Sequence, residues 1–332
     1  MDNLITLDYG SGGKKTSRLI EEILVPAFDN AALSALGDGA LIEGAGKLIF
    51  STDSFVVSPC FFPGGDIGKL SVCGTVNDIS MCGGEPKYLS LAFIIEEGFP
   101  LTDLQKIVSS IAKTAKDCGV SVVTGDTKVV ERGHGDGIYV NTAGIGFSRG
   151  VTLSADNIEE GDAVIVSGSI GDHGVAVMLA RNGLSGDVIS DCRPLNTIAA
   201  EVLKTGGGDV KVLRDPTRGG VATTLCEFME GSEFTIELFE EKLPITSTVS
   251  GACDMLGIDP LYSANEGKML AVVKNDRAEG VLCAMRSLPE GENAEIIGTV
   301  TRSHPGNVLL RTAFGGTRIL AKLTGAQLPR IC

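Results

Sequence analysis

The sequence lacks an excess of positive charge. Its 28 lysine and arginine residues stand against 42 aspartate and glutamate residues, which gives a formal net charge of −14 at pH 7. Binding to nucleic acid depends on neutralising backbone phosphates with Lys and Arg. We therefore expect no nucleic-acid partner.

Long apolar runs and a basic N-terminal segment are also missing. The chain opens with MDNLITLDYG, and apolar stretches such as LSLAFII are far shorter than the roughly 20 residues of a membrane span. We expect no signal peptide, no membrane association and a cytoplasmic location.

The sequence offers little for a zinc site or a disulfide framework. Its three histidines are scattered, and its nine cysteines include no C-x-x-C pair. A disulfide framework is also improbable in a chain of this length without a secretory signal. Most of the cysteines lie in apolar or helical contexts, where we expect buried and inert thiols.

Familiar nucleotide and nucleophile motifs are absent or out of context. The segment GSGGKKT has the wrong glycine spacing for a Walker A loop, and no G-x-G-x-x-G occurs. The segment GFSRG fits G-x-S-x-G around Ser148, but that motif needs a helix after it, and the following residues are turn-rich. A turn at a strand end accounts for Ser148 better than a hydrolase nucleophile.

Length and element order predict two α/β halves. A chain of 332 residues exceeds one typical domain. Strand and helix patterns alternate along it, and the stretch SRGVTLSADNIEEGD between them is polar and turn-rich. We place one domain at residues 1–150, a second at 151–312 and a tail at 313–332.

Two helices of the first half are predicted clearly. One opens at Asp66 and closes at the glycines of MCGG. The other opens with a capping box formed by Thr102 and Gln105. Its apolar positions, spaced for one helix face, are Leu104, Ile107, Val108, Ile111 and Ala115.

Four aspartates of the first half stand at predicted strand ends or turns: Asp38, Asp53, Asp78 and Asp126. Carboxylates brought together would repel one another unless a cation joined them. Mg2+ suits this role because it takes hard oxygen ligands and shares them with phosphates. The alternative is that each aspartate serves only a local turn or helix start.

Three polar segments could bind anions or hold a catalytic carboxylate. DYGSGGKKT could cradle phosphate with its backbone, with Lys14 or Lys15 as counter-charge, or it could be a flexible N-terminus. RDPTRGGVATTL places Asp215 and Arg218 at a helix start, which suits an anion or an ordinary cap equally. SANEGKM places Glu266 in a turn, where it could be catalytic or merely solvated.

The chain ends in PRIC, so its last side chain, Cys332, is a thiol. A lipid anchor, half of a disulfide and a chemical carrier are the competing interpretations. Prenylation at a C-a-a-X box needs the cysteine four residues from the end, so the lipid anchor fails. Residues 325–332 could reach about 25 Å if extended, which would let a carrier thiol enter a cleft of its own molecule or of a neighbour.

Together, these motifs resemble the HypE family of hydrogenase-maturation proteins. The matching segments run from GSGG through FSTDS, FFPGGDIGKLSVCGTVNDI, VTGDTKVV, VNTAGIG, SGSIGDHG, LRDPTRGGV and ANEGK to PRIC. The wider superfamily includes PurM (aminoimidazole ribonucleotide synthetase), thiamine-monophosphate kinase and selenophosphate synthetase. The last carries a reactive Cys or selenocysteine in its glycine-rich segment, where GSGGKKT has none, so this relative is disfavoured.

The resemblance implies a two-domain PurM-like fold with mixed sheets and a flexible C-terminal tail. It implies a homodimer, with ATP and Mg2+ bound near an interface shared by the N-terminal halves. The implied activity is ATP-dependent dehydration of an S-carbamoyl group on Cys332 to a thiocyanate, whose cyanide goes to the iron of nickel–iron hydrogenase. The implied partners are a HypF-like carbamoyl transferase as donor and a HypC–HypD-like complex as acceptor.

The resemblance also suggests site residues. The implied ATP ligands are Gly10, Gly12, Gly13, Lys14, Asp53, Asn77, Asp78 and Asp126. The implied Mg2+ ligands are Asp38, Asp53, Asp78 and Asp126. Beside the carrier Cys332, Glu266 is expected to be the base for the carbamoyl N–H, and Lys128 its partner or a phosphate contact.

Two other classes of function remain as alternatives. Another ATP-using enzyme of the superfamily, such as a small-molecule kinase or ligase, would keep full activity without Cys332. A non-catalytic scaffold or thiol carrier would hydrolyse no ATP.

Overall fold

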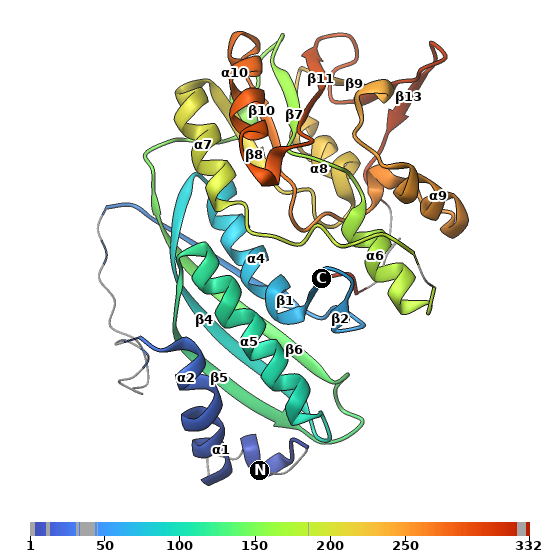
Figure 1. Ribbon diagram of the computed structural model, residues 1–332. Helices are drawn as coiled ribbons and strands as arrows, with labels where there is room; N and C mark the ends of the chain where they lie inside the picture. The colour runs from blue at the N-terminus through green and yellow to red at the C-terminus, as the bar shows by residue number, and fades with distance from the viewer. Residues whose placement is uncertain are drawn as a thin grey trace.

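The computed structural model describes residues 4–10, 14–30, 33, 44, 46–184, 186–323 and 330–332. These residues form two α/β halves, each built around one main sheet (Figure 1). The predicted α/β class with mixed sheets is confirmed, because both sheets combine parallel and antiparallel strand pairs.

The sheet of the first half has four strands in the order β1-β6-β4-β5. Their bounds are β1 Leu48–Phe55, β6 Ile138–Ser148, β4 Gly84–Glu96 and β5 Ser121–Val130. Two helices, α4 (Ile67–Met81) and α5 (Leu101–Cys118), lie across one face of this sheet (Figure 1). A small hairpin of β2 (Phe61–Phe62) and β3 (Gly65–Asp66) precedes α4.

Three short helical segments follow the glycine-rich segment. They are α1 (Lys14–Leu19), a π-helical turn over Ile20–Leu24 and α2 (Val25–Phe28). The π-helical turn and α2 contact α5, and α2 also contacts β5. The chain after the glycine-rich segment is therefore helical, in short consecutive pieces.

The two helices predicted in the first half differ in how they begin. Helix α4 begins as expected, because the Asp66 carboxylate accepts the N–H groups of Gly68 at 2.7 Å and Lys69 at 3.1 Å. The capping box predicted for α5 is wrong. That helix already begins at Leu101, directly after Pro100, so Thr102 lies inside the first turn and no side chain caps the helix.

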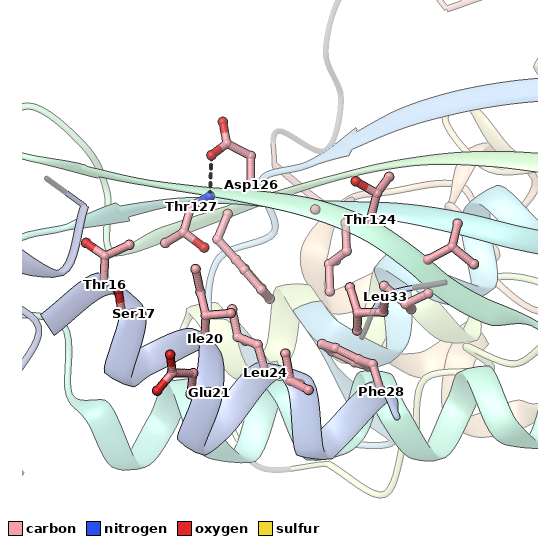
Figure 2. A pocket seen from close by; sticks show the side chains of 16 residues that line it. Thr16, Ser17, Ile20, Glu21, Leu24, Phe28, Leu33, Thr124, Asp126 and Thr127 are labelled. Atoms are coloured by element: carbon pink, nitrogen blue, oxygen red, sulfur yellow. Dashed lines mark hydrogen bonds between the residues drawn. The ribbon is translucent and has the colours of Figure 1, made fainter. Parts of the chain in front are cut away.

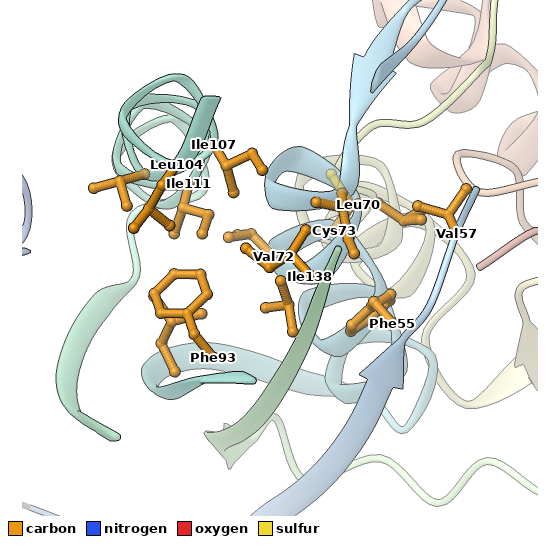
Figure 3. Packing of buried hydrophobic residues seen from close by; sticks show 14 of the residues in the cluster. Phe55, Val57, Leu70, Val72, Cys73, Phe93, Leu104, Ile107, Ile111 and Ile138 are labelled. Atoms are coloured by element: carbon orange, nitrogen blue, oxygen red, sulfur yellow. The ribbon is translucent and has the colours of Figure 1, made fainter. Parts of the chain in front are cut away.

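The core of the first half forms where α5, α4 and the sheet meet. Figure 3 shows Leu104, Ile107 and Ile111 of α5 directed toward Val72 of α4 and Phe93 of β4. All of them are buried, which confirms the predicted apolar face of α5. Burial of these side chains supplies the main force that holds α5 on the sheet.

The opposite face of this sheet, called the open face below, carries exposed apolar side chains. Leu48 is 55 %, Phe50 68 % and Ile94 45 % exposed. Strand register places Ser54, Asn141, Ala92 and Asp126 in one row across this face. Exposed apolar side chains gathered on one sheet face indicate an interaction surface.

The second half contains a seven-stranded sheet in the order β13-β12-β9-β11-β7-β10-β8. Its strands are β13 Thr317–Leu320, β12 Val308–Arg311, β9 Thr235–Phe239, β11 Glu295–Thr301, β7 Ala163–Val166, β10 Leu270–Val273 and β8 Val210–Arg214. Strand β13 pairs with β12, so residues 317–320 are part of this sheet although they lie within the stretch predicted as tail. The division near residue 150 stays a prediction.

Helices pack on both faces of the second sheet. The helices of this half are α6 Asp172–Arg181, α7 Asn196–Gly206, α8 Gly220–Met229, α9 Ser247–Leu256 and α10 Asn275–Arg286. One apolar core lies beneath α7 and α10, and another beneath α8. Within the described ranges, no helix is both long and apolar enough to cross a membrane.

Helix α4 joins the two halves. It packs on β1 and β6 of its own sheet and contacts α7 and β8 of the second half. Nearly all of its residues are buried, including the polar Ser71, Thr75 and Asn77. Helix α4 is therefore a buried contact between the two halves.

Truncating Ile107 in the core of the first half should destabilise the protein. Ile107 is fully buried, so Ile107→Ala is expected to lower the free energy of unfolding by about 2–5 kcal/mol. Ile319→Ala is the control, because Ile319 is 63 % exposed and should cost less than about 0.5 kcal/mol. Urea denaturation checks both, and equal losses in the two variants would contradict the packing described.

Candidate active site

A cavity of about 660 Å3 opens between the two halves. Strand β1 contributes Ser51 and Asp53 to its lining, and α4 contributes Asp78. The second half contributes acidic and basic side chains, and the end of the chain lies there as well. These further lining residues include Asp215, Arg218, Glu266 and Cys332.

Asp53 and Asp78 lie in the lining of this same cavity. Asp53 accepts the N–H of Ser54 at 2.7 Å, and Ser51 Oγ donates to Asp78 Oδ2 at 2.6 Å. Burial raises the pKa of the Asp53 carboxyl, and the charge of Asp78 adds to this effect. The two carboxylates thus lie in one cavity, where Asp53 is partly shielded from water.

Asp215 is the third acidic side chain of this cavity. It lies just after β8, and burial followed by the charge of Asp78 raises its pKa to about 7. The sequence singled out Asp215 only as part of a possible anion site or cap, because its turn gave no sign of proximity to Asp78. The structure adds it to the acidic group of the cleft.

The residues present fit Mg2+ only together with a nucleotide. Among the described residues, no three acidic, histidine or cysteine side chains form a metal site by themselves. Mg2+ is commonly held by one or two carboxylates plus phosphate oxygens and water. Asp53 and Asp78 supply such a pair of carboxylates at the wall of the cavity.

Asp126 and Lys128 do not join this group within one chain. Asp53 lies on edge strand β1 and Asp126 on edge strand β5. Three strand spacings separate these two strands, which is about 14 Å. Asp53 is aligned with Thr142, whose side chain faces α4, whereas Asp126 belongs to the open face. The two carboxylates therefore lie on opposite faces of the sheet.

Figure 2 shows Asp126 projecting from β5 away from Ile20, Leu24 and Phe28 of the N-terminal helices. Those helices and β5 enclose a second, mainly apolar pocket of about 310 Å3. The Asp126 carboxylate accepts a hydrogen bond from Lys128 Nζ at 2.7 Å, and this contact lowers the pKa of Asp126. Asp126 and Lys128 are thus paired with each other and half exposed or more.

The remaining predicted nucleotide ligands lie elsewhere or cannot be placed. Gly10 ends a short 3-10 turn that contacts β5, and Lys14 begins α1. Gly12, Gly13 and Asp38 lie outside the described residues.

Asn77, which the resemblance suggests as an ATP contact, is not among the residues that line the cavity. It is 1 % exposed. Its Nδ2 donates to the carbonyl oxygens of Arg193 at 3.2 Å and Glu266 at 3.4 Å, and its Oδ1 accepts the N–H of Leu195 at 2.8 Å. The amide is used by backbone groups of the second half, so Asn77 holds the halves together.

Glu266 is placed as a catalytic carboxyl would be. It lines the cavity, its side chain is buried, and Oε1 has no hydrogen-bond partner among the described residues. Burial, together with nearby Cys192 and Asp215, raises the pKa of Glu266 well above its usual range. A carboxyl with a free, buried oxygen can receive a proton from a group bound in the cavity.

The last residue of the chain, Cys332, lines this same cavity of its own molecule. The backbone N–H of Val56 donates to the Cys332 carbonyl at 3.1 Å, and that of Ser58 donates to the Arg330 carbonyl at 3.3 Å. Ile331 is buried in the core of the first half. Figure 1 places the C-terminus between the two halves, near β1, β2 and α6.

Two side chains of α6 also hold the tail. Together with the backbone of Val56 and Ser58 they form what is called the socket below. His173 Nε2 lies 2.9 Å from the Ile331 carbonyl oxygen, and Arg181 donates at 2.6 Å to the carbonyl of Arg330 and at 2.6 and 2.8 Å to that of Ser58. The sequence did not single out either residue for this role. The motif SGSIGDHG contains His173, but nothing in the sequence pairs it with the chain end.

The docked thiol is a weak nucleophile. Burial, with a further contribution from Glu266, raises the pKa of Cys332 to about 12, while Arg218 acts in the opposite direction. A protonated thiol reacts slowly with electrophiles. The docked position therefore suits chemistry on a group already attached to sulfur.

Comparisons with known proteins cover the whole chain. The family model "AIR synthase related protein, N-terminal domain" matches residues 29–148, and "AIR synthase related protein, C-terminal domain" matches 159–311. Carbamoyl dehydratase HypE of Rhizobium leguminosarum bv. viciae is 48 % identical over 332 residues, covering 99 % of this chain and 95 % of that protein.

Solved structures agree with these matches. The crystal structure of hydrogenase maturation protein HypE in complex with ATP is 46 % identical, with a TM-score of 0.94, covering 98 % of this chain and 99 % of that one. A chain of the HypE–HypF complex is 51 % identical, with a TM-score of 0.80, covering 92 % and 99 %.

Loosening the socket should expose the tail thiol. Arg181→Ala removes hydrogen bonds to the carbonyls of Ser58 and Arg330, so alkylation of Cys332 by iodoacetamide at pH 8 should accelerate about tenfold or more. Exposed Cys283 is an internal reference, and Arg277→Ala, at an exposed arginine, is the control. Peptide mass mapping measures the rates. Equal labelling of Cys332 and Cys283 in the unsubstituted protein would contradict the docked state.

Proposed function

Because this chain belongs to the HypE family of carbamoyl dehydratases in hydrogenase maturation, we propose that it dehydrates an S-carbamoyl group on Cys332 to a thiocyanate with the use of ATP. The observation that carries the proposal is the position of the tail. Cys332 lies in the same cavity as Glu266, Asp53 and Asp78, so a group on its sulfur would meet a base and a phosphate site together.

The dehydration needs both a base and a phosphate site. Oxide is too poor a leaving group to depart from a thiocarbamate unaided. Transfer of the γ-phosphoryl group of ATP to the carbamoyl oxygen, with loss of one N–H proton, releases ADP and turns that oxygen into part of a phosphate. Loss of the second N–H proton as the C–O bond breaks then gives S–C≡N and phosphate.

Each group of the cavity has a matching role. Glu266, once ionised, accepts an N–H proton from the carbamoyl nitrogen. Mg2+ held by Asp53 and Asp78 would neutralise the charge on the transferring phosphoryl group. Arg218, a further cation of the lining, lies beside the tail thiol and would interact with the same phosphate.

The raised pKa of Glu266 determines how activity depends on pH. A base must be deprotonated to act, so the rate of dehydration rises with pH through the raised pKa of Glu266, well above the usual value of 4.5.

A homodimer would explain the remaining predicted residues. The open face carries exposed Leu48, Phe50 and Ile94, and a second copy packed there would bury them. Asp126 and Lys128 stand on this face. They would then face the partner subunit, and we assign their roles toward ATP and the carbamoyl group to the partner's cavity.

The docked thiol also has to be loaded and unloaded elsewhere. A HypF-like carbamoyl transferase is the proposed donor, supported by the similarity to the chain in the HypE–HypF complex. A HypC–HypD-like complex is the proposed cyanide acceptor. All nine cysteines are free, which fits the reducing cytoplasm as the site of action.

Mass measurement of the C-terminal peptide tests the reaction. After carbamoylation with cyanate, Mg-ATP should remove one water from the peptide carrying Cys332, and Glu266→Gln should slow this by about 100-fold or more while ATP still binds. Glu292→Gln, outside the cavity lining, is the matched control.

Two results would contradict different parts of the proposal. If Glu266→Gln dehydrated the carbamoyl group at the full rate, the assignment of Glu266 as the base would be wrong. An unchanged carbamoyl peptide in protein shown to bind ATP would favour a kinase or ligase of the superfamily.

A charge on the open face should separate the dimer. Ile94→Asp places a carboxylate among apolar side chains, and it should give single chains in sedimentation and lose dehydration, because Asp126 and Lys128 no longer reach a partner. Ile319→Asp, on exposed edge strand β13 of the other sheet, is the control. A single chain with full activity would contradict the contribution of the partner.

A further inference from the structure

We infer that Asp191 is a positioning residue for the dehydration, which fixes the backbone at Glu266 so that its carboxyl faces the tail thiol. This inference rests on the proposed role of Glu266 as base. Asp191 touches neither the tail nor the predicted nucleotide ligands in any hydrogen bond described. It acts through the segment that carries Glu266.

Both oxygens of the Asp191 carboxylate are directed at that segment. Oδ1 accepts the N–H of Glu266 at 3.1 Å, and Oδ2 accepts the N–H of Gly267 at 3.2 Å. A side chain at Gly267 would overlap the carbonyl oxygen of Asp191. The two segments are thus in direct backbone contact, and a rotation of the Glu266 peptide would break both hydrogen bonds.

The other side of the Glu266 backbone is held as well. Its carbonyl oxygen accepts from Asn77 Nδ2 at 3.4 Å and from the N–H of Arg193 at 3.4 Å. The backbone of Glu266 is therefore fixed at both ends, whereas its side-chain Oε1 has no partner among the described residues. Such an arrangement holds a reactive group in place without using its hydrogen-bonding capacity.

A buried cation keeps this arrangement electrically balanced. Lys268 Nζ lies 3.4 Å from Asp191 Oδ2, and the two side chains are 5 % and 2 % exposed. An isolated carboxylate at this depth would be costly, and the pair offsets that cost. Removing Asp191 alone leaves a buried lysine unpaired, so loss of charge balance and loss of position must be separated by experiment.

The residue before Asp191 belongs to the tail socket. Ser190 Oγ lies 2.8 Å from His173 Nδ1, and the other nitrogen of this imidazole faces the Ile331 carbonyl. Neighbouring residues thus place the two reacting partners, Ser190 through His173 for the tail and Asp191 for Glu266. This short segment therefore contributes to the position of both the thiol and the carboxyl.

The test compares Asp191→Asn, Lys268→Met and the double variant in full-length protein carbamoylated with cyanate. Single-turnover dehydration at saturating Mg-ATP should slow about 100-fold in Asp191→Asn, with the KM for ATP changed less than about threefold. The double variant removes the unpaired lysine and should regain thermal stability, but not rate. Asp162→Asn is the matched control, because Asp162 is also buried and accepts a backbone N–H but is not a lining residue of the cavity.

Normal turnover in the stable double variant would overturn the inference, as would an equal loss of rate in Asp162→Asn. A rise in KM for ATP with an unchanged rate constant would also overturn it, because it would place Asp191 in nucleotide binding. Failure of the proposed function looks different, since the unsubstituted protein would then not dehydrate, or Glu266→Gln would remain active.

Discussion

Acidic side chains crowded around one cavity are the constraint on which the rest of this structure depends. Asp53, Asp78, Asp215 and Glu266 come from separate segments of both halves, and burial and mutual repulsion raise the pKa of three of them. Such crowding opposes folding unless protons, a cation or hydrogen bonds offset it. Helix α4 holds the halves in contact despite this repulsion, and nucleotide with Mg2+ would relieve it.

The sequence predicted well those features of the fold that a local residue pattern determines. The apolar spacing in α5 identified its buried face, and Asp66 identified the start of α4, because both signals lie within a few residues. The start of α5 was predicted wrongly because Pro100 already sets the first turn, leaving Thr102 nothing to cap.

The site was predictable only in part, because it depends on contacts between distant segments. Asp53, Asp78, Glu266 and Cys332, which the sequence singled out, line one cavity. Asp126 looked equivalent to Asp53 in the sequence, but strand order and register place it on the opposite face. Asp191 gave no signal at all, since its partners are backbone groups 75 and 76 positions away.

The residues that hold the tail contact its main chain and not its sulfur. Their hydrogen bonds reach the carbonyls of Arg330, Ile331 and Cys332, and the socket residues named above include none that contacts Sγ. A bare thiol, a carbamoyl thioester and a thiocyanate would accordingly compete for the socket on nearly equal terms. Discrimination between a loaded and an unloaded tail would then depend on the cavity wall and on the nucleotide, and a tail in this position would keep another chain's tail out of the cavity.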